Sequence, residues 1–248
     1  MEFGNDIILQ DVNFEVFKGE IFVIVGGSGC GKTVLMKNMI GLYRPSAGRV
    51  MIEGIDINTG SEGALAMVRR RIGVLFQSGA LIGSMSLAEN VALPLGEQRR
   101  LSPALIEMVV KLKLGMVNLA GYGNHMPAEL SGGMKKRAGL ARAMVMDPTT
   151  LFFDEPSSGL DPVTAADLDN TIKGINEGMG TTMVIVSHDL ASIMSIAHRV
   201  IMLDKNQKGI IAQGIPAELK ENSDDPRVIN FFNRSHEEIK AQRAAHGR

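Results

Sequence analysis

The chain carries the stretch Ile21-Phe22-Val23-Ile24-Val25-Gly26-Gly27-Ser28-Gly29-Cys30-Gly31-Lys32-Thr33, which continues into Val34-Leu35-Met36. The unbroken apolar run at its start predicts a buried strand, and the apolar spacing after Thr33 predicts a helix. Between them, residues 26–33 fit the pattern G-x-x-x-x-G-K-[ST] in the strand–loop–helix context that this pattern requires. Its glycines let successive backbone N–H groups turn towards an anion, and the helix N-terminus adds partial positive charge. The stretch therefore predicts a binding site for the phosphates of a nucleotide.

The side chains of this loop have expected roles on that nucleotide. Lys32 is expected to neutralise the β- and γ-phosphate oxygens, and Thr33 to offer its hydroxyl to Mg²⁺. Cys30 has a steric interpretation before a redox one, because it lies inside the glycine loop. The alternative, an ordinary glycine-rich turn, does not account for the lysine and the flanking elements. The predicted nucleotide-binding residues are Gly26, Gly27, Ser28, Gly29, Cys30, Gly31, Lys32 and Thr33.

Two further segments have weaker signals of their own. Residues 151–155 form an apolar strand that ends in Asp154 and Glu155, so that the first carboxylate can hold Mg²⁺ and the second can face a nucleophilic water. A helix cap or a simple turn would also fit this pair. Residues 130–134, Leu-Ser-Gly-Gly-Met, precede a helical pattern and offer free N–H donors to an anion, although an N-cap alone would look the same.

The remaining apolar pattern predicts an α/β fold. Further buried strands are expected at residues 151–153, 183–186 and 200–203, with helices at 34–40 and 168–175. Strands that alternate with helices imply a parallel sheet covered on both faces. We expect residues 50–52 to pair with residues 7–17 as an antiparallel side sheet, and a hairpin around the polar turn at 205–209. The basic runs 69–71 and 135–137 are expected to be solvated helix faces.

Composition excludes several classes of protein. The 248 residues are 45% hydrophobic and 21% charged, as in globular domains. A net charge of −1 argues against a nucleic-acid partner, which usually calls for a strong basic excess. The apolar runs are far shorter than the roughly 18 residues of a membrane-spanning helix. A single Cys30 excludes an internal disulfide, and the N-terminus lacks a secretory signal, which predicts a cytoplasmic location.

The order of the three motifs, at residues 26–33, 130–134 and 154–155, resembles that of ABC transporter ATPases over nearly the whole chain. The resemblance implies a P-loop NTPase (RecA-like) core with an antiparallel side sheet and an inserted helical subdomain. On this reading, residues 1–248 form a single ABC ATPase domain. Its parts are the core at 1–77 and 140–222, the helical subdomain at 78–139 and a C-terminal tail at 223–248.

The resemblance also assigns individual residues. Residues 130–134 look like the signature motif, with Met134 where glutamine is commonest, and residues 157–162 look like the D-loop. Gln77 resembles the Q-loop glutamine and His188 the switch histidine that contacts the γ-phosphate. Phe3 is the aromatic in the place where adenine usually stacks.

Two MgATP are expected to be sandwiched between two copies of such a chain, with residues Ser131, Gly132 and Gly133 of each copy closing on the nucleotide of the other. The resemblance implies catalytic roles for Glu155 as general base and for Lys32, Ser131 and His188 as charge stabilisers around the γ-phosphate. It also implies a catalytic role for Gln77, which would touch Mg²⁺ and the attacking water. It implies a Mg²⁺ shell formed by Thr33, Gln77 and Asp154.

A closer resemblance, to the ATPases of Mla-type (Mce-associated) phospholipid transport systems, is visible in three places: residues 75–81 with 91–95, residues 130–134, and residues 225–228 with Phe231 and Phe232. This implies an integral-membrane permease as partner, docked at residues 78–95, and a peripheral location on the cytoplasmic face of the inner membrane of a double-membrane bacterium. The alternatives are the ATPase of an amino-acid or metal importer, and a soluble ABC ATPase without membrane subunits. A catalytically silent regulatory module is disfavoured by the intact Lys32, Glu155 and His188.

Overall fold

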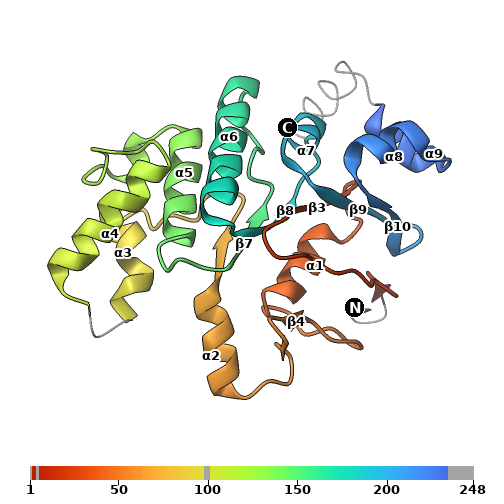
Figure 1. Cartoon of the computed structure of the whole chain (residues 1–248), viewed down its shortest axis with the longest axis horizontal. Coiled ribbons are helices and arrows are strands. Elements are labelled where there is room, and N and C mark those ends of the chain that lie inside the picture. Colours follow the sequence, from red (N-terminus) through yellow and green to blue (C-terminus); the bar gives the residue numbers. More distant parts are fainter. Residues whose placement is uncertain (1, 4–5, 98–100, 234–248) are drawn as a thin grey trace.

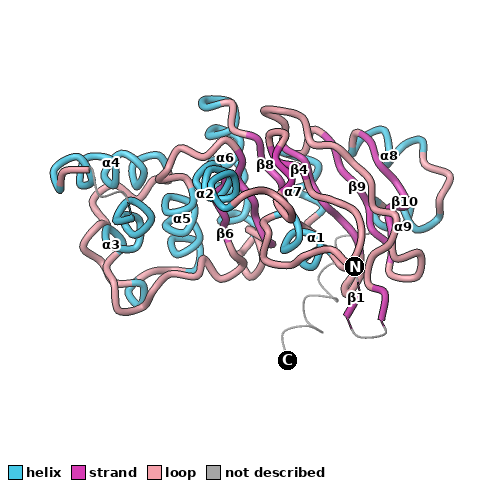
Figure 2. The backbone as a smooth tube through the Cα atoms, turned by 90° about the horizontal axis from the view of Figure 1, so that it is seen from below, coloured by secondary structure: helices cyan, strands magenta, loops and turns pink. Residues whose placement is uncertain are grey.

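A six-stranded sheet forms the centre of the molecule in the computed structural model, which describes residues 2–3, 6–97 and 101–233 (Figures 1 and 2). Its strand order is β10-β9-β3-β8-β7-β6, and all neighbours are parallel except the β9–β10 hairpin. The strands are β3 (Ile21–Gly26), β6 (Ile72–Leu75), β7 (Thr150–Asp154), β8 (Thr182–Val186), β9 (Arg199–Asp204) and β10 (Gly209–Gly214). The expected parallel sheet and the terminal hairpin are both confirmed.

Alternating side chains of β3 build two separate cores, one on each face of the sheet. Phe22 and Ile24 pack with α1 (Lys32–Met39), which lies on one face. Val23 and Val25 belong to the other core, together with α6 (Pro162–Met179), α7 (Leu190–Ile196) and the helical lobe. Figure 1 shows α1 and α6 on opposite sides of the sheet. Because both faces are covered, every residue of β3 is buried.

A lobe of helices lies beside the β6 edge of the sheet (Figure 1). It contains α3 (Leu87–Ala92), the 3₁₀ turn Leu93–Glu97, α4 (Pro103–Met116), the 3₁₀ turn Pro127–Glu129 and α5 (Gly132–Ala143). The signature-like helix α5 packs directly on β6, since a Cβ at Gly139 would lie 2.8 Å from the Leu75 side chain. A Cβ at Gly73 would lie 2.0 Å from the carbonyl oxygen of Ala143, so glycine is required on both sides of this contact.

The expected pairing of residues 50–52 with residues 7–17 is wrong. Two short hairpins stand there instead: β1 (Glu2–Phe3) pairs with β2 (Asp6–Ile7), and β4 (Met51–Ile52) pairs with β5 (Ile55–Asp56). Glu53 and Gly54 have φ of 49° and 79°, so the chain turns back at once and β4 takes β5 as its partner. Residues 8–17 alternate in burial but belong to no strand, because their apolar side chains pack on the core without a hydrogen-bonded ladder.

The connections and the C-terminal part add the remaining helices. The basic run 69–71 ends α2 (Glu62–Arg71) and is solvent-exposed, as predicted, where cations favour the helix dipole. After β10 come α8 (Pro216–Asn222) and α9 (Pro226–Phe232). Val228, Phe231 and Phe232 of α9 are buried against the main core, which confirms the expected short docking helix.

Candidate functional site

The predicted site residues follow neighbouring strands of the sheet. The glycine loop follows β3, His188 follows β8, Asp154 and Glu155 end β7, and Gln77 follows β6. These strands are adjacent in the order β3-β8-β7-β6 and run parallel. Their carboxyl ends therefore meet at one edge, which is where open α/β sheets bind ligands.

The glycine loop presents free N–H groups to this edge. Helix α1 starts at Lys32 with Gly31 as its N-cap, and no side chain caps its first turn. Gly29 and Gly31 have φ of 75° and 98°, a backbone that other residues rarely adopt. Lys32 Nζ donates to the carbonyl oxygens of Gly26, at 2.9 Å, and Gly27, at 3.0 Å. The ammonium group thus lies over the loop, where it could pair with the phosphates of the predicted nucleotide.

Cys30 packs inside the loop and not at its mouth. It is 2% exposed and belongs to the same core as Met36 of α1. Burial raises the pKa of its thiol, against the opposing charge of Lys32. A Cβ at Gly26 would lie 2.7 Å from Cys30 Sγ and 2.4 Å from the carbonyl oxygen of Leu203, so the two residues share a confined space.

Asp154 and Thr33 form the part of the site suited to a metal ion. Thr33 Oγ1 donates to Asp154 Oδ1 over 3.4 Å. Asp154 is 8% exposed, and its pKa is raised, first by burial and then by the neighbouring Glu155 charge. A buried carboxylate with a raised pKa gains from a cation, and carboxylate and hydroxyl oxygens are the ligands that Mg²⁺ prefers. No cluster of three or more metal-binding His, Cys, Asp or Glu side chains occurs in the described part of the chain. This fits Mg²⁺, which usually takes few protein ligands and completes its shell with phosphates and water.

Glu155 is held in a strained and well-anchored conformation beside His188. Its φ is 50°, an uncommon value for a residue other than glycine. Its N–H donates to the carbonyl oxygen of Val186 over 2.9 Å, which ties it to the neighbouring strand. Its Oε2 lies 2.7 Å from His188 Nδ1. The Glu155 side chain is 13% exposed and that of His188 53%, so the histidine lies on the solvent side of the pair.

Gln77 reaches the segment that follows Glu155. Gln77 Nε2 donates to Ser158 Oγ over 3.2 Å. Both side chains are solvent-accessible at this contact, and Ser158 belongs to the segment 157–162 that resembles the D-loop. The structure thus brings Gln77, Glu155 and His188 to one region, while their catalytic roles stay predictions.

The signature-like residues lie on different elements from the loop of the same chain. Ser131 caps α5 and accepts from the N–H of Met134 over 3.3 Å. Gly132 is exposed, and Gly133 is buried against Thr164 of α6. Helix α5 packs on α3, α4, α6 and β6, whereas α1 packs on β3, β7 and β8. No hydrogen bond joins residues 131–133 to residues 26–33, both of which the structure describes. Phe3 belongs to β1, but its side chain lies outside what the structure describes.

One expectation about α5 needs correction. Lys136 was expected on a solvated face with Lys135 and Arg137, but it is 6% exposed. Its Nζ donates to the backbone carbonyl oxygens of Glu155, Pro156 and Ser158. The sequence contains a signal for this burial, because Gly133, Lys136 and Leu140 lie at helical spacing and all three are buried.

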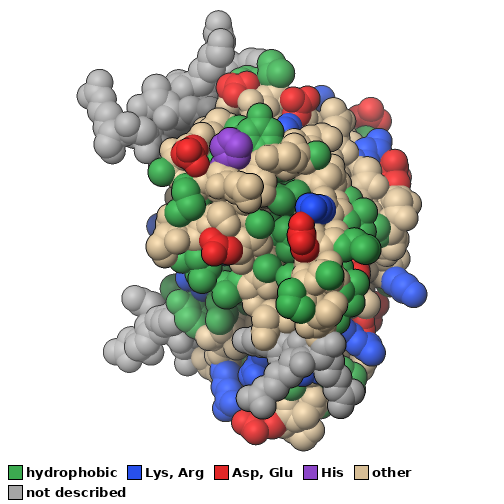
Figure 3. All heavy atoms as spheres, turned by 90° about the vertical axis from the view of Figure 1, so that its left-hand side faces the viewer, with side chains coloured by type: hydrophobic (Ala, Val, Ile, Leu, Met, Phe, Trp, Pro, Cys, Tyr) green, Lys and Arg blue, Asp and Glu red, His purple; other side chains and the backbone are tan. Residues whose placement is uncertain are grey.

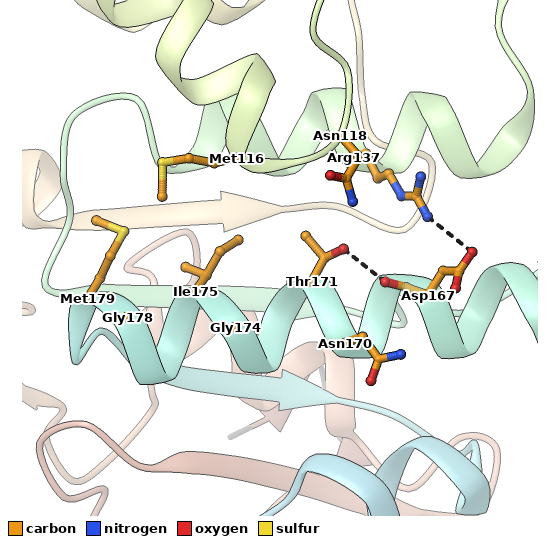
Figure 4. Close-up of a pocket in the computed structure, with 10 residues that line it drawn as sticks. All are labelled: Met116, Asn118, Arg137, Asp167, Asn170, Thr171, Gly174, Ile175, Gly178 and Met179. Carbon is orange, nitrogen blue, oxygen red and sulfur yellow. Dashed lines mark hydrogen bonds and ion pairs between the residues drawn. The ribbon is translucent and has the colours of Figure 1, made fainter.

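A groove near these elements lies away from the site (Figure 4). It has a volume of about 580 Å³ and is lined by residues of α6, the end of α4 and Arg137 of α5. Arg137 crosses it to pair with Asp167 at 3.7 Å. None of the predicted nucleotide-binding residues that the structure describes lines this groove.

Comparison with known proteins identifies the family to which this chain belongs. A family model described as ABC transporter matches residues 9–158. The chain belongs to that family. The intermembrane phospholipid transport system ATP-binding protein MlaF of Haemophilus influenzae is 42% identical over 92% of this chain and 86% of that protein. The probable ribonucleotide transport ATP-binding protein mkl of Mycobacterium leprae is 43% identical over 93% of this chain, which spans 66% of its length.

Solved structures agree with this membership. The dimeric structure of a post-hydrolysis state of the ATP-binding cassette MJ0796, bound to ADP and Pi, superposes with a TM-score of 0.77. It is 31% identical and covers 87% of this chain and 94% of that one. The expected ABC ATPase fold is therefore confirmed. Among the helices that the structure describes, none is long and apolar enough to cross a membrane.

Proposed function

We propose that the chain is the ATP-hydrolysing subunit of an ABC transporter, and that two copies act around two MgATP. The observation that carries the proposal is the pair Glu155 and His188, 2.7 Å apart, beside Asp154 and at the same sheet edge as Lys32. A catalytically silent module would need neither a general base nor a histidine at this position. A soluble ABC ATPase without membrane subunits is disfavoured by the transport systems named for its relatives.

Each residue has a defined task in this reaction. Lys32 and the loop N–H groups bind the phosphates, and His188 contacts the γ-phosphate and orients Glu155. Glu155 accepts a proton from the attacking water at a carboxylate oxygen. Thr33, Asp154 and Gln77 would hold Mg²⁺, which supplies positive charge to the phosphates when bound. Ser131, Gly132 and Gly133 serve the nucleotide of the second copy, since they lie on other elements than the loop of their own chain.

The cargo we propose is phospholipid, and the partner is an integral-membrane permease that places the chain on the cytoplasmic face of the inner membrane. The 42% identity to an intermembrane phospholipid transport ATP-binding protein, over 92% of this chain, supports the lipid assignment. Amino-acid and metal importers stay the alternatives within the family.

The permease is proposed to dock on residues 78–86, directly after Gln77. Asn90 is 0% exposed and holds this loop through bonds to the backbone of Ile82, Met85 and Ser86. Arg142 of α5 adds a bond to the carbonyl oxygen of Gly79. The loop is therefore a fixed platform, and Ile82 is 38% exposed on it. Figure 3 faces the lobe that carries this platform, where exposed hydrophobic side chains are interspersed among charged ones.

Replacement of Glu155 by Gln tests the proposed chemistry. The carboxamide keeps the shape but cannot take a proton, so kcat is expected to fall by roughly 10² to 10⁴ while ATP still binds. Hydrolysis by wild type and variant is measured with MgATP, and affinity is measured with a fluorescent ATP analogue. Glu218→Gln, on exposed α8, serves as the control and should hydrolyse normally. Wild-type turnover in Glu155→Gln would falsify the assigned role.

A further inference from the structure

Lys136 is a buried cation in a helix that otherwise buries small and apolar side chains. It is 6% exposed and lies one turn from Gly133 and one turn from Leu140 on the inner stripe of α5. Burial lowers the pKa of its amino group to about 8, although the negative charge of Glu155 acts to raise that pKa. Burying a lysine lowers the stability of the fold unless its N–H donors are hydrogen-bonded, so the contacts of Lys136 indicate its role.

The three donors of Lys136 converge on one short segment. Nζ lies 2.6 Å from the carbonyl oxygen of Pro156 and 3.4 Å from that of Glu155, and it also donates to the carbonyl oxygen of Ser158. No carboxylate pairs with Lys136 among the described residues; all of its partners are backbone carbonyls. An ammonium group has three N–H bonds, so the three acceptors saturate it.

This segment contains the group on which hydrolysis is proposed to depend. Glu155 has a φ of 50°, which the chain adopts only when neighbouring contacts hold it. Its N–H is tied to Val186 of β8, and its carbonyl oxygen is the one that Lys136 contacts from α5. Ser158, anchored by the same lysine, receives the hydrogen bond from Gln77. Lys136 thus fixes from one side the backbone that carries both the base and the contact of Gln77.

We propose that Lys136 is a positioning residue for ATP hydrolysis, which holds the backbone of residues 155–158 so that the Glu155 carboxylate keeps its place beside His188. The inference rests on the proposed function, because it assigns to Lys136 an effect exerted through Glu155. Because α5 also begins at Ser131, the same helix links the residue that would contact the partner's nucleotide to the base of its own site.

The test compares Lys136→Met with Lys136→Arg and Lys136→Gln in the full chain. Methionine preserves the length and apolar stem but removes all three donors. We expect kcat of Lys136→Met to fall by about 10- to 100-fold, the scale of a displacement of about 1 Å at a reacting group. The affinity for ATP and KM should stay within about threefold, because Lys136 touches no residue of the glycine loop. Arginine keeps the charge and several donors and should recover most of the lost kcat.

Lys135→Met is the matched control. Lys135 is the next residue of the same helix, is half-buried and makes no hydrogen bond or ion pair through its side chain among the described residues. The Lys135→Met protein should hydrolyse ATP at the wild-type rate. If Lys136→Met does not fold, as judged by its melting temperature, Lys136→Gln and Lys136→Arg carry the same comparison.

A double-substitution experiment separates positioning from a general structural effect. If Lys136 acts through the Glu155 carboxylate, Lys136→Met should add little to the single-turnover rate loss already caused by Glu155→Gln. Equal losses in both backgrounds would overturn the inference. A normal kcat in folded Lys136→Met, or in Lys136→Gln if Lys136→Met does not fold, would also overturn it. If Glu155→Gln itself hydrolyses normally, the proposed role of Glu155 as general base fails, and this inference fails with it.

Discussion

Lys32 is the residue whose position most directly predicts nucleotide affinity. Its ammonium group rests on the carbonyl oxygens of Gly26 and Gly27, at 2.9 and 3.0 Å, so a bound phosphate would replace two neutral acceptors by a charged one. Lys32→Ala is expected to weaken ATP binding by about 10- to 100-fold, since a hydrogen bond to a charged group contributes roughly 1.5–3 kcal/mol. Titration with a fluorescent ATP analogue measures this.

Lys205→Ala, in the exposed turn between β9 and β10, is the control for loss of a positive charge. It should bind ATP as wild type does. Unchanged affinity in Lys32→Ala, with a normal melting temperature, would remove the lysine from the phosphate site and leave the helix N-terminus as the anion-binding element.

At the scale of elements, α6 and α7 meet at a buried carboxyl group that predicts a pH dependence of stability. Asp169 of α6 is 4% exposed, accepts a bond from Ser192 Oγ over 2.6 Å, and has a second oxygen without a hydrogen-bond partner among the described residues. Burial raises its pKa from 3.8 to about 6, with a further contribution from the charge of Asp189. Because the folded state binds the proton more tightly, this group favours folding below the unfolded pKa. That contribution is lost as the pH rises through about 6.

Asp169→Asn removes the titration and keeps an acceptor for Ser192. We expect the melting temperature of the variant, relative to wild type, to rise across the window from pH 3.8 to about 6 and then to level off. Asp167→Asn is the control on the same helix: Asp167 is 60% exposed, and its pair with Arg137 at 3.7 Å is worth less than about 1 kcal/mol. A constant difference at every pH for Asp169→Asn would contradict the assignment.

The loop after β6 is the element on which the permease contact depends. Ile82 is 38% exposed, whereas its neighbour Leu81 packs against the main core, so Ile82→Asp changes the surface without burying a charge in the fold. We expect Ile82→Asp to lose copurification with the permease while ATP binding stays normal, because the contact would bury an unpaired carboxylate. Met108→Asp, on α4 and 67% exposed, is the control. If Ile82→Asp retains the permease as well as Met108→Asp does, the docking surface lies elsewhere.

Much of the arrangement of elements was predictable from the sequence, for reasons that differ between elements. The strands at 21–26, 182–186 and 199–204 are buried on both faces, so their continuous apolar runs identify them. Residues 8–17 have the alternation of a strand, but they lack the partner strand that was expected for them. That partner, β4, pairs with β5 because the chain turns back at Glu53 and Gly54. Lys136 was missed because its charge suggested solvent, although its spacing on α5 indicated the interior.

In the whole molecule, the predicted nucleotide contacts fall into two separate groups. The glycine loop, Asp154, Glu155 and His188 share one sheet edge, while Ser131 and Gly132 lie on the lobe without a bond to them. Their roles stay predictions, but the separation itself favours a second copy as the source of the missing contacts.

The dimer can be tested at its proposed closing point. In Glu155→Gln, slow hydrolysis should hold two copies together, so light scattering with ATP should report twice the mass of 26.7 kDa. Adding Gly132→Glu should return the mass to that of one copy, because a carboxylate would face the partner's phosphates. The fold tolerates this change locally, since a Cβ at Gly132 would lie 3.7 Å from the Leu160 side chain, an ordinary contact. Gly132 makes no hydrogen bond to the glycine loop of its own chain, both of which the structure describes, so the doubly substituted protein should still bind ATP. A doubly substituted protein that dimerises as well as Glu155→Gln would show that residues 131–133 do not close on the second nucleotide.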